Sequence, residues 1–181
     1  MKSAISLIIF FAIAVIAWWT ITKSDDDQLE AFKSKQYIEV FMNGFEITAM
    51  NESGTPDYIL NGAHLERYNN SNNTHIQQPV FQLLQKNNQW KIIADKARIN
   101  DKSDIIVLRD NVVMQQQNIE PAVTIHTQSL IFNTKKQVVT TKEAVEITQG
   151  NSLMKSKGMI FNNVTSELEL SSNVSGYYLP L

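Results

Sequence analysis

A short pattern of apolar residues occurs three times in this chain of 181 residues, and it limits the possible fold more than any other feature. Each copy has two apolar residues two positions apart, then a polar turn with Asn, then a second, mostly apolar pair. The copies begin at Ala97, Leu130 and Met159, so the offsets are 33 residues (97 to 130) and 29 residues (130 to 159). Alternation with a period of two is typical of β-strands, and a period of about 30 residues indicates stacked strand–turn–strand units. Because one unit is too small to bury its own apolar face, we expect an array of strands around a continuous apolar interior.

The segment before the repeats also alternates as strands do. From Tyr37 to Met50, the odd positions form one predicted face with Phe41, Phe45 and Ile47. A turn follows at residues 51–54, where Gly54 suits a positive φ. No convincing helical period appears after residue 36. The sequence therefore predicts an all-β domain over residues 37–181.

The first residues predict a membrane anchor. Residues 3–22 carry no charge, and twenty residues in a helix span roughly 30 Å, which is enough to cross the hydrocarbon core of a bilayer. Trp18 and Trp19 lie at the far end, where an interfacial aromatic belt is expected. A cleaved signal peptide is the alternative, because Ala12-Ile-Ala14 fits a cleavage site, but the apolar run continues well beyond it. We therefore predict an uncleaved transmembrane helix within residues 1–23.

A charged segment at residues 24–36 connects the anchor to the strands. Its acidic residues come first and its basic residues last, which is compatible with a short helix capped by Ser24 or with a solvated spacer. The short amino-terminal tail favours a cytoplasmic amino terminus and a translocated domain. The predicted organisation is thus anchor, connector and β-domain.

Composition excludes several classes of function. Lys and Arg number 16 against 18 Asp and Glu, so the basic excess typical of nucleic-acid binding is missing. The chain has no Cys, which removes thiol catalysis and thiolate metal sites. The three His residues are scattered, and no catalytic motif is present. We therefore predict a protein that is not an enzyme and uses neither a cofactor nor a metal. The alternative of a eukaryotic secreted protein remains, because Asn-x-Ser/Thr triplets, which are acceptors for N-glycosylation, begin at Asn51, Asn69, Asn72, Asn163 and Asn173.

Several segments in a fixed order resemble the LptC family of lipopolysaccharide export. They are Asn51-Glu-Ser-Gly54, Tyr58-Ile-Leu60, Ala63 to Tyr68, Gln78-Pro-Val80-Phe81, Trp90 to Ala97, and the three repeats. The resemblance covers nearly the whole chain and rests on order and spacing, because no single motif decides it. It implies an open, V-shaped, twisted β-jellyroll with LptA-like repeats. It also implies a single-pass protein of the inner membrane whose β-domain lies in the periplasm.

The function that the resemblance implies is a relay of lipopolysaccharide toward the outer membrane. The protein would accept lipopolysaccharide from the inner-membrane transporter LptBFG and pass it to the periplasmic bridge protein LptA. The amino-terminal edge and the transmembrane helix would meet LptF and LptG, and the carboxyl-terminal edge would meet LptA. The alternative from another class is a tethered adaptor that recruits partner β-domains through its edge strands without binding lipid.

Two sets of residues are the candidate sites. Inward apolar side chains could line a lipid trough or form an ordinary closed core, which pattern alone does not distinguish. They are Phe41, Phe45, Tyr58, Leu60, Phe81, Leu83, Trp90, Ile92, Ile99, Ile106, Leu108, Ile125, Phe132, Val139, Phe161 and Leu168. The predicted partner contacts are Tyr37, Gly54, Gly150, Val174, Gly176 and Tyr177. For Gly54 and Gly150, a turn that requires a positive φ is the alternative role.

Overall fold

A computed structural model describes residues 36–84 and 89–179, together with Val15 and Trp18. The chain divides into two compact units, Met1–Tyr37 and Ile38–Leu181. Apart from Val15, Trp18 and Gln36, the predicted anchor and connector lie outside the described residues. Among the described residues, no helix has the length and apolar character needed to span a membrane. The described strands all belong to the second unit.

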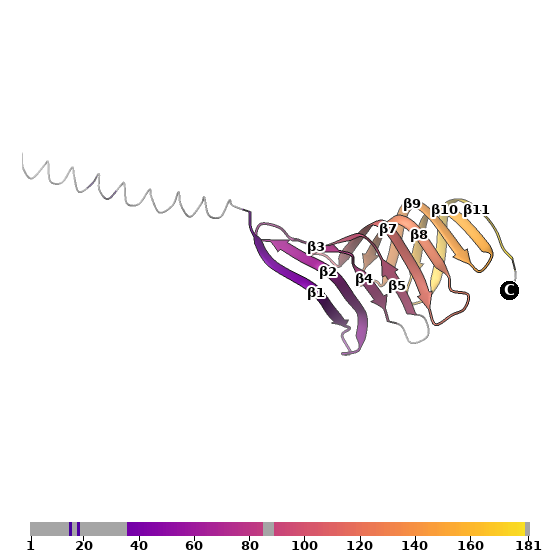
Figure 1. The fold of residues 1–181 in the computed structure, drawn as a ribbon, viewed down its shortest axis with the longest axis horizontal. Coiled ribbons are helices and arrows are strands. Elements are labelled where there is room, and N and C mark those ends of the chain that lie inside the picture. Colours follow the sequence, from indigo (N-terminus) through magenta and orange to yellow (C-terminus); the bar gives the residue numbers. More distant parts are fainter. Residues whose placement is uncertain (1–14, 16–17, 19–35, 85–88, 180–181) are drawn as a thin grey trace, which may run out of the picture. The chain divides into compact units, whose positions relative to one another are not determined.

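Eleven strands of the described residues form one antiparallel sheet (Figure 1). They are β1 (Ile38–Met50), β2 (Pro56–Tyr68), β3 (Asn73–Gln77), β4 (Val80–Leu83), β5 (Gln89–Ile93), β6 (Lys96–Asn100), β7 (Ile105–Gln117), β8 (Thr124–Asn133), β9 (Val138–Gln149), β10 (Ser152–Asn162) and β11 (Glu167–Tyr177). The order along the sheet is β11-β10-β9-β8-β7-β5-β4-β2-β3-β6, β1 pairs with β2, and β7 also pairs with β6. The prediction of an all-β domain is confirmed.

The sheet is folded lengthwise into two leaves. The first half of β2 pairs with β4 and its second half with β3, while β7 pairs first with β6 and then with β5. One leaf, which we call the first leaf, therefore contains β4, β5, the start of β2 and the end of β7. The second leaf contains β3, β6, the end of β2 and the start of β7. The long strands β8 to β11 continue both leaves, and the apolar core lies between them.

Irregular residues in the middle of the long strands produce this fold. Gly44 in β1, Asp110 and Asn111 in β7, Gly158 in β10 and Asn173 in β11 all have positive φ angles. The pairing registers shift near the same level, as between Arg109 and Val112. A bulge bends a strand and re-aims its side chains, and Gly, Asn and Asp tolerate the left-handed conformation best. We call this line of irregularities the crease, and the opposite side, where the strand ends meet, the mouth.

The three sequence repeats correspond to three hairpins. β6–β7, β8–β9 and β10–β11 are connected by turns that begin at Asn100, Asn133 and Asn162, which keep the offsets of 33 and 29 residues. In each turn the Asn side-chain oxygen accepts a backbone N–H two or three residues ahead: Lys102 N at 3.0 Å, Lys136 N at 2.8 Å and Val164 N at 2.9 Å. Such Asx turns reverse a chain locally. The polar residue of the repeat is therefore the one that ends each strand.

Candidate functional site

The space between the leaves is filled with apolar side chains. Of the predicted lining residues, the following are buried: Leu60, Phe81, Leu83, Trp90, Ile92, Ile106, Leu108, Ile125, Phe132, Val139 and Phe161. Phe45, Tyr58 and Ile99 are partly buried and pack against them. The inward orientation predicted for these residues is confirmed. Because several have no exposed surface at all, the middle of the interior is sealed, and contact with lipid there stays a prediction.

The inward orientation predicted for Phe41 is wrong. It pairs with Glu66, whereas its neighbour Met42 pairs with the buried Leu65, so Phe41 lies on the outer face and is 63% exposed. The simple alternation of β1 predicted Phe41 and Phe45 on one face. Gly44, with a φ of 54°, lies between them and interrupts that alternation, so only Phe45 packs inward.

The apolar inner rows continue beyond the sealed middle onto the first and last strands. Leu168 pairs with the buried Phe161 and therefore belongs to the inner row, yet it is 38% exposed. At the other end, Ile47 pairs with the buried Leu60 and is equally exposed. In the described part of the chain, no further strand covers these two residues. Both ends of the interior consequently present accessible apolar surface.

Aromatic rings form a seam across the interior. Phe132, on the second leaf, lies edge-on to Tyr58 and Phe81 of the first leaf, with ring centroids 5.9 and 6.5 Å apart. Farther along, Trp90 of the first leaf contacts Phe161 of the second with centroids 4.9 Å apart. Edge-to-face pairs at such distances are attractive beyond the area that they bury. The seam therefore holds the two leaves together near the mouth.

Hydrogen bonds also bridge the mouth. Gln137 Nε2, in the turn before β9, donates to Asp57 Oδ2, at the start of β2, over 2.7 Å and also to the Thr134 carbonyl oxygen over 2.8 Å. Asn163 Nδ2 donates to Gln137 Oε1 over 3.0 Å. Gln137 and Asn163 are buried, and burial raises the pKa of the Asp57 carboxyl. We call Asp57, Gln137 and Asn163 the clasp.

No pattern in the sequence predicts the clasp. Asp57, Gln137 and Asn163 lie in or beside polar turns, where solvated side chains are routine, and Asp57 and Gln137 are 80 positions apart. The pairing that brings them together depends on how the two leaves close. Burial of the Tyr58 hydroxyl, together with the nearby charge of Asp57, raises the pKa of Tyr58 as well. The clasp therefore sits in a poorly solvated part of the mouth.

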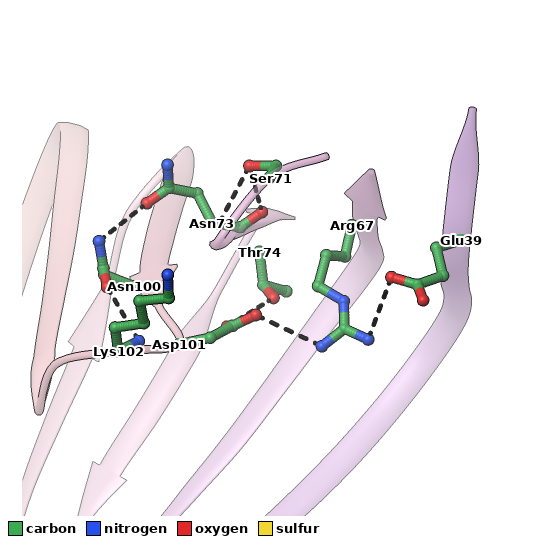
Figure 2. A network of polar contacts seen from close by, with 8 residues as sticks. All are labelled: Glu39, Arg67, Ser71, Asn73, Thr74, Asn100, Asp101 and Lys102. Atoms are coloured by element: carbon green, nitrogen blue, oxygen red, sulfur yellow. Dashed lines mark hydrogen bonds and ion pairs between the residues drawn. The ribbon is translucent and has the colours of Figure 1, made fainter. Parts of the chain in front are cut away.

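Figure 2 shows a second polar network, where β1 meets the end of β2. The Arg67 guanidinium lies 3.4 Å from a Glu39 carboxylate oxygen and 3.3 Å from an Asp101 oxygen, and Thr74 donates to the other Asp101 oxygen over 3.1 Å (Figure 2). Arg67 thus connects β1 with the turn after β6. All three charged side chains are substantially exposed, so the network contributes modestly to stability.

The predicted partner contacts lie at the two edges and in turns. Tyr37 precedes β1, while Val174, Gly176 and Tyr177 lie on β11, where Val174 and Tyr177 are exposed. Among the described strands, β1 pairs only with β2 and β11 only with β10, so each leaves one edge unpaired. Their role with partners stays a prediction.

Three of the glycines meet different structural requirements. Gly54 and Gly150 have φ angles of 74° and 55° and lie in turns, as predicted for a positive φ. Gly176 is needed for another reason, because a Cβ there would lie 2.8 Å from the Met154 Cα. The two turn glycines therefore have a structural role whether or not a partner contacts them.

Comparison with known proteins agrees with this architecture. The family model described as "Lipopolysaccharide-assembly, LptC-related" matches residues 6–179. The chain belongs to the LptC family. Membership supports a role in lipopolysaccharide transport and is consistent with a protein that is not an enzyme. In residues 36–84 and 89–179, no three His, Asp or Glu side chains gather where a metal ion could bind.

A solved structure shares the fold. The chain is similar to LptH, described as the LptA-homologous periplasmic component of the lipopolysaccharide transport device of Pseudomonas aeruginosa. The TM-score is 0.52 at 5% sequence identity, and the match covers 68% of this chain and 95% of LptH. At this identity the likeness concerns the fold alone, so it confirms a jellyroll of the LptA type. No curated protein sequence matches significantly.

Proposed function

We propose that this LptC-family protein is a lipopolysaccharide relay that holds acyl chains between its two leaves. It receives lipopolysaccharide from the LptBFG transporter and passes it to LptA, and it is anchored in the inner membrane by residues 1–23 with its β-domain in the periplasm. The observation that carries the proposal is the apolar inner face, which is sealed in the middle and accessible at both ends, at Ile47 and Leu168.

Acyl chains fit such an interior because they need apolar area and no directional bonds. Parting the leaves near the mouth separates the aromatic seam, at about 0.5–1.5 kcal/mol per ring pair, and one hydrogen bond to a carboxylate, at about 1.5–3 kcal/mol. Three ring pairs cross between the leaves, so the cost is roughly 3–7.5 kcal/mol. Each acyl methylene that is buried contributes about 0.8 kcal/mol, so roughly four to nine buried methylenes offset this cost. A single long acyl chain is therefore sufficient.

The unpaired edges suit transfer between domains. An exposed strand edge accepts a partner strand, and two jellyrolls joined in this way align their inner faces. We assign β1 to LptF and LptG, and β11 to LptA. The end of β11 favours pairing because Val174, Gly176 and Tyr177 carry no charge.

Photo-crosslinking from adjacent residues on opposite faces tests the relay. A benzophenone amino acid replaces Leu168, which faces inward, or Glu169, which faces outward and is also exposed. In membranes that contain lipopolysaccharide, the relay predicts lipid adducts at position 168 and none at position 169. Phe161 and Ile160 form a second such pair. Adducts with proteins alone at every position would reject the relay and favour the tethered adaptor.

A further inference from the structure

A polar depression lies directly over the clasp. It spans the mouth between the β1–β2 turn and the start of β2 on one side, and the turns before β7 and β9 on the other. Its polar lining includes Asn51, Ser53, Asp57, Thr134 and Gln137, and Tyr58 also borders it. Tyr58 is in turn part of the aromatic seam. The depression is thus continuous with the entrance to the apolar interior.

The chemistry of this lining selects a neutral, hydroxyl-rich group. Amide, hydroxyl and carboxylate side chains both donate to and accept from hydroxyl groups. The charged groups in the lining are Glu52, Asp57 and Asp104 against Lys135, so the phosphates of a phosphorylated glycolipid stay outside the depression and its sugar hydroxyls are the groups that bind there. Sugar hydroxyls meet this requirement, and a glycolipid carries them next to its acyl chains.

Asp57 can exchange its partner without loss of hydrogen bonds. A carboxylate has about four lone-pair sites, and a ligand hydroxyl can donate where Gln137 Nε2 donates now. Gln137 Nε2 keeps the Thr134 carbonyl oxygen as its acceptor after the exchange. The other N–H of Gln137 Nε2 loses Asp57 and hydrogen-bonds to water that enters as the leaves part, so the exchange keeps the number of hydrogen bonds only when the mouth opens.

We propose that the depression binds the sugar head group of a glycolipid, with Asp57 accepting a hydrogen bond from a hydroxyl, and that this exchange releases Gln137 and lets the leaves part. The inference rests on the proposed lipid relay and adds to it a head-group site and an opening step. Head-group recognition and entry of the acyl chains are then coupled through one carboxylate.

Two substitutions that both break the clasp separate recognition from opening. The full chain, with a benzophenone at Phe81, is reconstituted in vesicles that contain either lipid A or phosphatidic acid, an anionic phosphate lipid without a sugar or glycerol head group. Gln137→Leu removes the donor but leaves Asp57, so adducts with both lipids should rise while their ratio is kept. Asp57→Leu also opens the mouth but removes the acceptor, so the ratio of lipid A to phosphatidic acid adducts should fall about tenfold or more.

A second substitution at Asp57 and a control variant complete this experiment. Asp57→Asn keeps an acceptor without the charge and should give an intermediate ratio, and it serves if Asp57→Leu fails to fold. Gln115→Glu, at an exposed position opposite Lys91, is the matched control and should change neither the amount of adduct nor the ratio.

An unchanged ratio in Asp57→Leu would overturn the head-group site alone. A preference that EDTA abolishes would indicate a bound cation instead and would also overturn it. No lipid adduct in the unmodified chain would refute the relay itself, and the head-group site with it.

Discussion

Replacement of Phe132 by Ala should remove a large part of the stability of the β-domain. Phe132 has no exposed surface and contacts Tyr58 and Phe81 across the interior. Truncation of a buried Phe costs about 3–5 kcal/mol, and each aromatic contact adds about 0.5–1.5 kcal/mol beyond buried area. Measured truncation costs already include lost ring contacts, and two are lost here, so we expect a value at the upper end of the range, about 4–5 kcal/mol, against a total of about 5–15 kcal/mol for a typical domain.

Urea unfolding of the full chain, followed by the circular dichroism of the strands, measures this change. With a slope of about 2 kcal/mol per molar urea, the midpoint should fall by about 2 M. Phe41→Ala is the matched control, because Phe41 is exposed on the outer face, and it should cost less than about 1 kcal/mol. A loss below about 2 kcal/mol for Phe132→Ala, or equal losses for both variants, would refute the sealed interior.

Three further changes test other parts of the account. Gly158→Ala places a side chain at a φ of 86° and a Cβ only 2.9 Å from Ser171 Oγ, so it should lower the free energy of unfolding by about 2–3 kcal/mol. Gly54→Ala is the control: Gly54 also has a positive φ but open space around it, so the free energy should fall by about 1 kcal/mol. Equal losses in the two variants would exclude crowding at the crease. Burial raises the pKa of Asp57 above its usual 3.8, so the folded state favours the protonated carboxyl. The stability that this adds is complete below pH 3.8 and is lost as the pH rises through the folded-state pKa. Asp57→Asn removes the titrating group and should therefore flatten the pH dependence of the free energy of unfolding just above pH 3.8. Arg67→Ala should cost about 1 kcal/mol and speed amide exchange in the first half of β1; unchanged exchange would show that the ion pair with Glu39 does not hold this strand.

The strands and most inward residues could be predicted because they follow local rules. Alternation identified the buried rows, and the repeat offset identified the hairpins, since the Asn turns recur at Asn100, Asn133 and Asn162. Phe41 failed because one positive φ at Gly44 reverses the face, and alternation assumes a regular strand. The exposure of Leu168 follows from its place on β11, the last strand of the sheet, as the open end of the repeat array predicted.

The clasp could not be predicted, because it depends on tertiary closure of the leaves. Gln137 looks like any polar turn residue until the mouth brings Asp57 within hydrogen-bonding distance. The same holds for the aromatic seam, whose rings come from strands far apart in sequence. Features that arise between the leaves are therefore the part that the structure adds.

The central claim, that lipid lies between leaves that part at the mouth, is tested most directly by a distance measurement across the mouth. Because the chain has no Cys, spin labels attach only at introduced thiols, here at the exposed positions Ser53 on the first leaf and Lys136 on the second. Labels at Lys102 and Lys136, both in turns of the second leaf, serve as the control. If the leaves part, lipopolysaccharide lengthens the 53–136 distance and leaves the 102–136 distance unchanged. An unchanged 53–136 distance with lipopolysaccharide bound would contradict it.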